Sequence, residues 1–167
     1  MPVERGSTLH AAYIKEQLAA QEVRKASIEQ RGAGVITTSG VLVSLLFGLA
    51  AILTGAENYQ LPGHAKSWLL AAMISFVVAA LAAIVTSAPL FYSGPKIRDL
   101  EEAIKGPVWQ ESPADAEKRI AATEIKVLAT ARSRNTFKGY ALLLAILTQV
   151  CALVFLAIAI SVILDNG

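Results

Sequence analysis

Polar and apolar residues are separated along this chain into long blocks. No Asp, Glu, Lys or Arg occurs from Gly32 to Ala56, from Ser67 to Pro95 or from Gly139 to Leu164. These blocks hold 25, 29 and 26 residues, and about 20 apolar residues are enough for a helix to cross the hydrocarbon of a bilayer. The pattern therefore predicts three transmembrane helices, near residues 35–54, 67–92 and 139–164.

Composition supports lipid rather than water as the solvent of these helices. Apolar residues make up 54% of the 167-residue chain and charged residues 17%, against about 25% charged in a typical soluble domain. Burying three such helices on all sides would need a larger shell than this chain supplies. The predicted fold class is an all-α integral membrane protein with three spans and cytoplasmic helical extensions.

The remaining segments also have helical character. Residues 7–31 contain no Pro or Gly and are rich in helix-forming side chains, and Gly32 to Gly34 then mark either a bend or a tight helix contact. Ser112 and Pro113 have the N-cap and first-turn preferences of a helix start. No breaker follows, so one helix is expected from about 113 to 164, and a shorter one over 95–105.

These elements predict four consecutive parts of the chain. They are a cytoplasmic helix over 1–34, a transmembrane hairpin over 35–92, a cytoplasmic helical segment over 93–138, and the third span with a short outer tail over 139–167.

The basic residues predict the orientation. Five precede the first span and nine lie between residues 93 and 138, whereas the connection at 55–66 holds only Lys66 and the tail holds none. Because basic residues accumulate on the cytoplasmic side, we expect the N-terminus and 93–138 inside and the C-terminus outside. No signal peptide is expected, since the first apolar run follows a long charged segment. The protein is thus predicted to be multi-pass in an inner (plasma) membrane.

Small residues recur every fourth position in the spans. Gly40, Ser44 and Gly48 share one face of the first span, and Ser75, Ala79 and Ala83 share one face of the second. In lipid, such residues permit the close approach on which helix association depends. The two faces are therefore candidate packing surfaces, either within one chain or between copies.

The predicted spans contain few other polar side chains. They contain no charged residue, which argues against a proton-coupled transporter. Gln149 is the most polar residue well inside a span and either bonds another helix or lines a pore, where Thr37 is a second candidate. The chain has no phosphate-binding glycine loop, HExxH, Gly-x-Ser-x-Gly or CxxC motif. We expect no enzymatic activity and no cofactor, and a net charge of +2 gives no reason to expect a nucleic-acid partner.

The stretch EVRKASIEQRGAGVITTSGVLVSLLFGLAAI, residues 22–52, resembles the start of small bacterial membrane effectors of nucleotide-signalled phage defence, the Pycsar-type and SLATT-type proteins. The resemblance covers residues 20–92, and the third span departs from the two-span plan most common among them. It implies a homo-oligomer that receives a signal on its cytoplasmic helices and perturbs the inner membrane.

If that signal is a nucleotide, its phosphate suits basic side chains. The candidate contacts are Arg24, Lys25, Arg31, Arg132 and Arg134. The alternative is that these residues hold the helix ends at anionic lipid headgroups.

Three functions follow from the sequence. The first is a homo-oligomeric effector or channel-like protein in the bilayer, triggered through its cytoplasmic helices. The second is a non-conducting membrane scaffold or accessory subunit that docks a cytoplasmic protein partner. The third is a holin-like lytic protein, although such proteins rarely carry a long cytoplasmic hairpin.

Overall fold

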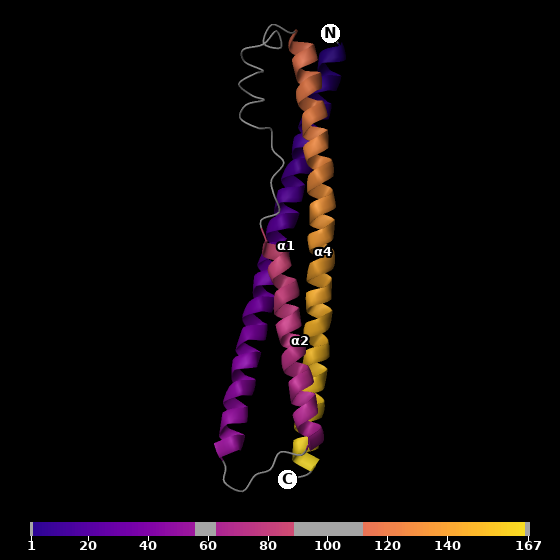
Figure 1. Cartoon of the computed structure of the whole chain (residues 1–167). Coiled ribbons are helices and arrows are strands. Elements are labelled where there is room, and N and C mark those ends of the chain that lie inside the picture. Colours follow the sequence, from indigo (N-terminus) through magenta and orange to yellow (C-terminus); the bar gives the residue numbers. More distant parts are fainter. Residues whose placement is uncertain (1, 56–62, 89–111, 166–167) are drawn as a thin grey trace. The chain divides into compact units, whose positions relative to one another are not determined.

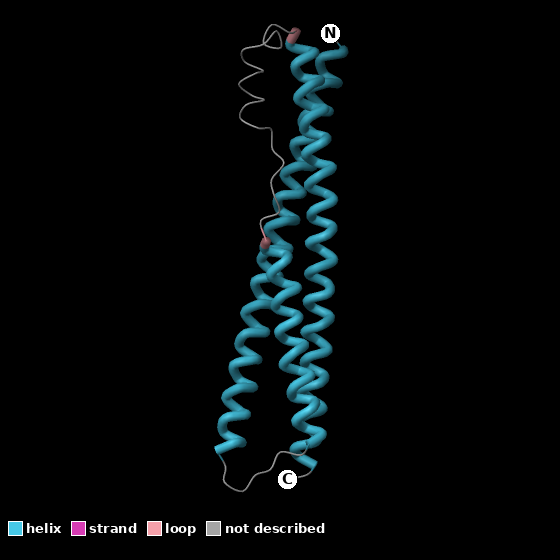
Figure 2. Tube along the Cα trace, viewed as in Figure 1, coloured by secondary structure: helices cyan, strands magenta, loops and turns pink. Residues whose placement is uncertain are grey.

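The chain folds into three long helices. The computed structural model describes residues 2–55, 63–88 and 112–165, which form α1 (Pro2–Gly55), α2 (Gly63–Ser87) and α4 (Pro113–Asp165) (Figure 1). No strand occurs among these residues (Figure 2), so the predicted helical fold class is confirmed. Each helix is long and apolar enough to cross a membrane, and the chain is in this respect consistent with a multi-pass membrane protein.

The helix boundaries confirm part of the sequence pattern. Ser112 caps α4, because its Oγ accepts a bond from the backbone N–H of Asp115 at 3.3 Å and donates to Asp115 Oδ2 at 2.7 Å. From Pro113 this helix continues without a break through the third predicted span. By contrast, α2 ends at Ser87, before the predicted limit at residue 92. The short helix expected over 95–105 lies outside the described residues.

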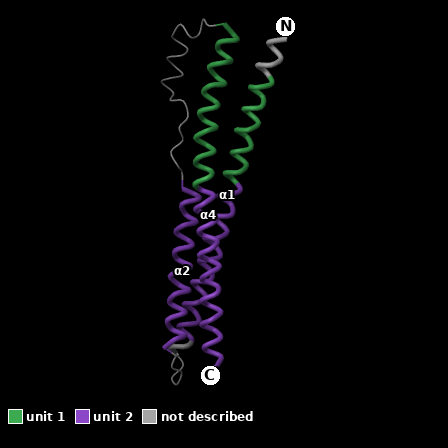
Figure 3. Tube along the Cα trace, turned by 90° about the vertical axis from the view of Figure 1, so that its right-hand side faces the viewer, with its two compact units in different colours: residues 1–26, 89–137 green, residues 27–88, 138–167 purple. Residues whose placement is uncertain are grey.

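The chain divides into two compact units, coloured separately in Figure 3. Unit 1 consists of Met1–Ala26 and Pro89–Phe137, and unit 2 of Ser27–Ala88 and Lys138–Gly167. Both units therefore contain parts of α1 and α4, whereas α2 belongs to unit 2 alone.

In unit 1, α1 and α4 run in the same direction. Arg132 donates a hydrogen bond to Gln17, and Asn135 donates a hydrogen bond to Gln21. Residue numbers rise on both helices from the first pair to the second, which is the relation expected of parallel helices. The helices are thus held in register by polar side chains.

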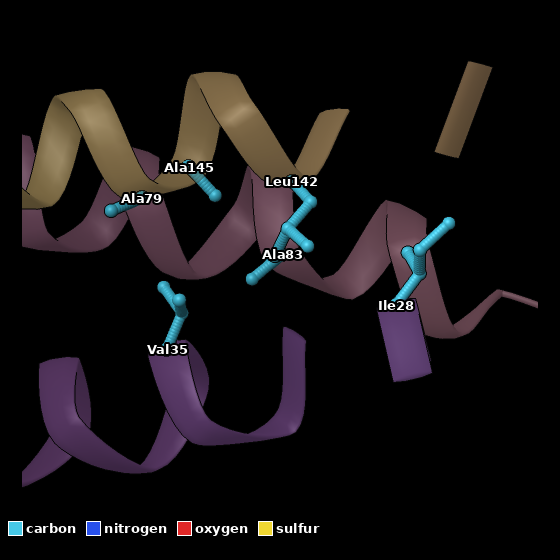
Figure 4. Close-up of a cluster of buried hydrophobic side chains, with 6 residues drawn as sticks. All are labelled: Ile28, Val35, Ala79, Ala83, Leu142 and Ala145. Carbon is cyan, nitrogen blue, oxygen red and sulfur yellow. The ribbon is translucent and has the colours of Figure 1, made fainter. Parts of the chain in front are cut away.

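Unit 2 is a three-helix bundle with two apolar clusters. The first contains Val35 on α1, Ala83 on α2 and Leu142 on α4 (Figure 4). The second contains Phe76 and Ala152, with Leu42 packed against them. From the first cluster to the second, residue numbers rise on α1 and α4 and fall on α2. Therefore α1 and α4 are parallel and α2 is antiparallel to both, as a chain that crosses a membrane three times requires.

The buried positions of unit 2 follow a heptad pattern. On α2 they are Ala65, Ala72, Phe76, Ala79, Ala83 and Thr86. Ala65 precedes Ala72 by seven residues, and the others follow at alternating intervals of four and three. Buried positions of α1 and α4 have intervals of three, four or seven residues. An average of 3.5 residues per turn keeps one side of each helix against its neighbours in a left-handed bundle.

The interior of unit 2 is made of small side chains and its exterior of large apolar ones. Of the eleven buried apolar residues that the structure describes, seven are alanine. Exposed residues include Leu45 on α1, Leu81 on α2 and Leu147 on α4, each more than half exposed. This distribution inverts that of a soluble helix bundle, and it is what close helix packing within lipid requires.

Helix α1 approaches α2 closely at Gly32. A Cβ atom built at Gly32 would overlap Thr86 Oγ1 and would lie 3.3 Å from the carbonyl oxygen of Ala83. Of the two readings of Gly32 to Gly34, the structure therefore supports a tight helix contact, at Gly32, and α1 continues through it.

We expect Gly32→Ala to destabilise unit 2 by about 1–3 kcal/mol, because a methyl group inserted into a packed contact forces the two helices apart. The measurement is the thermal unfolding midpoint of the detergent-solubilised protein. Gly139→Ala is the matched control, since a Cβ at Gly139 meets nothing within 4 Å. Equal midpoints for the two variants would contradict the packing described here.

Candidate functional site

Polar side chains join α1 to α4 in each unit. In unit 1, Arg132 Nη2 donates to Gln17 Oε1 at 3.0 Å. Asn135 Nδ2 lies 2.8 Å from the carbonyl oxygen of Gln21 and 3.1 Å from its Oε1, and donates to both. Asn135 is only 4% exposed. A buried polar side chain at a heptad position fixes register, because any shift of the helices would leave it unpaired.

In unit 2 the corresponding contact is a salt bridge. Lys138 Nζ lies 2.7 Å from Glu29 Oε1, and the side chain of Lys138 is 3% exposed while that of Glu29 is 33% exposed. Desolvation of a charge is costly unless an opposite charge and hydrogen bonds compensate it. Glu29 is therefore the group that allows the ammonium of Lys138 to remain buried between helices.

Helix α1 carries an open face within the first predicted span. We define the open face of α1 as Thr37, Gly40, Ser44 and Gly48, all of which are exposed. A Cβ atom at Gly40 or Gly48 would meet nothing within 4 Å. The hydroxyls of Thr37 and Ser44 donate to the carbonyls of Ala33 and Gly40, at 3.0 and 2.9 Å. Because these hydroxyls are already bonded within the helix, the face can lie against apolar surroundings.

The small residues predicted as packing surfaces thus have different environments. Ala79 and Ala83 on α2 are fully buried in the first cluster, and Ser75 is half-buried. A Cβ atom at Gly40 or Gly48 would meet no atom of the described residues within 4 Å. Within the described residues, the packing inside one chain therefore uses α2 and not the open face of α1.

Two interior hydroxyls have different partners. Thr86 Oγ1 donates to the carbonyl oxygen of Ala83 at 2.6 Å. Ser39 is 1% exposed, and its Oγ has no hydrogen-bond partner in the described structure. It lies on α1 between Val35 of the first cluster and Leu42 of the second. Gln149, the candidate polar residue of the third span, is half-buried on α4.

The predicted anion contacts are divided between the units. Arg24, Lys25, Arg132 and Arg134 belong to unit 1, and Arg31 belongs to unit 2. All are exposed except Arg134, which is half-buried. Their role as ligand contacts stays a prediction.

Sequence reasoning missed the contacts between α1 and α4. Glu29 and Lys138 lie next to charge-free blocks at the same predicted membrane surface, so the parallel direction of the two helices could have indicated their pairing. The pair formed by Gln21 and Asn135 had no comparable signal, since amide side chains are also common on exposed helix faces.

Comparison with protein-family models, with curated proteins and with solved structures finds no match. Among the described residues, no group of three or more His, Cys, Asp or Glu side chains could hold a metal ion.

The salt bridge predicts an asymmetry between two variants. Glu29→Ala leaves the buried ammonium of Lys138 without this partner and is expected to cost about 2–3 kcal/mol. Lys138→Met should cost less, because Met fills much of the same space and Glu29 retains access to solvent. Thermal unfolding in detergent is expected to rank the midpoints as wild type, then Lys138→Met, then Glu29→Ala. The reverse order of the two variants would contradict the assigned contact.

The unpartnered hydroxyl of Ser39 predicts a stabilising substitution. A buried polar group without a partner costs about 1–3 kcal/mol, and Ser39→Ala removes it with little change in volume. We expect a higher thermal midpoint for Ser39→Ala than for wild type. Ser44→Ala is the control, because that hydroxyl is exposed and bonded to Gly40, and should change the midpoint less. A lower midpoint for Ser39→Ala would mean that its hydroxyl has a stabilising partner.

Proposed function

We propose that the protein is a homo-oligomeric effector of a bacterial inner membrane, channel-like in action and triggered through the helices of unit 1. The observation that carries this proposal is the open face of α1. Lipid-exposed helix surfaces elsewhere in unit 2 present large side chains such as Val78 and Leu144. The open face instead combines two glycines with hydroxyls that are bonded within the helix, which is the composition of a helix–helix contact in lipid.

The packing of unit 2 supports an oligomer in a second way. Most of its described buried residues are apolar, among them several alanines, Phe76 and Leu142. In this proposal the path for ions through the membrane lies between copies. Thr37 and Ser44 are the exposed hydroxyl-bearing residues of the open face that could line it, and Gln149 is the polar candidate on α4.

The trigger in this proposal is a signal that acts on unit 1. The bonds of Gln17 to Arg132 and of Gln21 to Asn135 hold α1 and α4 in register. A ligand that changes this register would alter two helices that also form unit 2. A nucleotide phosphate fits the basic residues Arg24, Lys25, Arg132 and Arg134 chemically, as would anionic lipid. In this proposal unit 1 and the N-terminus are cytoplasmic and the C-terminus lies outside.

The second candidate function is a non-conducting membrane scaffold or accessory subunit. The composition of the interior of unit 2 favours it, because most of the buried residues that the structure describes there are apolar. The two functions differ in whether assembled copies change the permeability of the membrane.

Expression of the full chain in a bacterium, with a voltage-sensitive dye as the readout, separates these functions. We expect the wild type to lower the membrane potential and to arrest growth. Gly40→Leu and Gly48→Leu should abolish both effects, because a large side chain on the open face prevents close approach of copies.

Ala157→Leu is the matched control, since Ala157 is exposed on α4 outside the open face, and it should behave as wild type. Each variant is compared at equal abundance in the membrane fraction. An unchanged potential at high expression of the wild type would contradict the channel-like function and favour the scaffold.

A further inference from the structure

Helix α1 keeps one register against α2 from Gly32 to Leu46. Gly32 lies against Thr86, and Leu46 packs against the second apolar cluster, which includes Ala72. Between these two contacts α1 advances by fourteen residues and α2 returns by fourteen. Two antiparallel helices in constant register pair residues in this way, so the partners of later positions on α1 follow from the same relation.

The sequence of α1 continues the packing pattern beyond Leu46. Residues of α1 that face the bundle follow one another at alternating intervals of four and three up to this position. The next two positions of the heptad are Leu49 and Leu53. In the register of the earlier contacts they correspond to Leu69 and Ala65 on α2. The pattern therefore predicts two further turns of contact between α1 and α2.

The structure leaves these further contacts open. All six residues of 47–52 are exposed, and Leu49 is 37% exposed. This end of α1 lies apart from α2 and α4 in Figure 1. The other two helices stay packed at the same end of the bundle, since Ala65 on α2 and Ala159 on α4 are 0% exposed. Only α1 leaves the bundle.

The departure of α1 uncovers one row of α2. Ala83 and Phe76 are 0% exposed, whereas Leu69, seven residues before Phe76 and thus on the same side of the helix, is half-buried. Leu69 is also the residue that the register places opposite Leu49. Matching leucines on α1 and α2 are therefore partly exposed where the pattern expects them to meet.

Lipid makes an open and a closed position of this end of α1 similar in energy. In water, exposed leucine side chains would drive closure, because their burial removes apolar surface from water. In hydrocarbon a leucine side chain meets either lipid tails or another helix, so only van der Waals packing separates the two positions. A segment with two positions of similar energy populates both.

The sequence where α1 leaves the bundle favours bending. Gly40 and Gly48 flank Ser44, whose hydroxyl donates to the carbonyl oxygen of Gly40 at 2.9 Å. Glycine, and serine bonded to the preceding turn, are common at bends in helices. Leu46, the last residue of α1 packed against the second cluster, lies in the same stretch. A change in direction of α1 would therefore fall between Gly40 and Gly48.

We propose that residues 47–55 form a hinged segment of α1 that closes onto α2. In the closed position Leu49 lies against Leu69, and Leu53 lies at the level of Ala65. The occupant of the exposed leucine positions is thus another helix of the same chain, and the movement needs no second copy. The structure shows the open position of this segment.

Closure would also change the open face of α1. Gly48 belongs to the hinged segment, whereas Gly40 and Ser44 precede it. Bending between them alters the surface that the proposed function assigns to contacts between copies. This consequence rests on the proposed function, whereas the movement itself takes place within one chain.

The test is an intrachain disulfide in the full chain, in native membranes, with Cys151→Ala as background. Leu49→Cys is combined with Leu69→Cys, and copper phenanthroline joins thiols whose Cα atoms approach within about 7 Å. The yield is the loss of maleimide-reactive thiols in the monomer band. We expect several-fold more disulfide than for Phe47→Cys with Leu69→Cys. This second pair is the matched control, because Phe47 lies on another side of α1 and is 60% exposed.

Leu46→Cys with Ala72→Cys calibrates the reaction, since both positions belong to the packed part of the bundle. Efficient cross-linking of this pair without a disulfide between positions 49 and 69 would overturn the inference, because the segment would then stay open to lipid or to another molecule. Equal yields for the pairs that contain Leu49→Cys and Phe47→Cys would overturn it as well. A failure of the proposed channel-like function would not change these results, because the disulfide forms within one chain.

A substitution gives an independent readout. Leu53→Ala removes a side chain that the closed position places against α2, and it should lower the disulfide yield between positions 49 and 69 several-fold. Ile52→Ala is the control, since Ile52 is 72% exposed and lies outside the heptad row, and it should leave the yield unchanged. Equal yields for the two variants would contradict closure onto α2.

Discussion

Close contact between helices through small side chains is the constraint on which the bundle of unit 2 depends. Alanine at 65, 72 and 79 on α2 and at 145, 152 and 159 on α4 leaves little side chain between the helices. In lipid the removal of apolar surface from water no longer distinguishes inside from outside, so van der Waals contact supplies the attraction between helices. The large apolar residues can then face outward, and Gly32 can approach Thr86 without a Cβ atom between them.

Polar contacts fix the relative direction and the register of α1 and α4. Rows of alanine alone do not fix the register of two packed helices, because every alanine of a row offers the same contact surface. The bonds of Asn135 to Gln21 and of Lys138 to Glu29 are specific to one alignment of α1 and α4. These are the two helices that belong to both units. In the proposed effector function, a signal received by unit 1 and a response in unit 2 would therefore involve the same two helices.

The faces of α1 differ in what they contact. One side packs against helices of its own chain, at Ile28, Val35 and Ser39. The other carries Gly40, Ser44 and Gly48 and has open space around its glycines. A glycine within a helix costs about 1 kcal/mol relative to alanine, and on a surface that faces lipid alone nothing offsets that cost. Contact with another copy of the chain would supply the missing stabilisation.

The sequence by itself determined the three apolar helical segments, the capped start of α4 at Ser112, and the continuity of α4 into its apolar half, whereas the continuity of α1 through Gly32 came from the structure. These features follow from local composition and from charge-free length, which need no knowledge of the partner helix. Only the tertiary structure decided which small residues are contacts. The spacing of Gly40, Ser44 and Gly48 is as regular as that of the buried alanines, but a helix has several faces and the sequence of one helix does not identify the face that meets another. The pairing of Lys138 with Glu29 was likewise decided by packing, because two residues far apart in the chain meet only when their helices align.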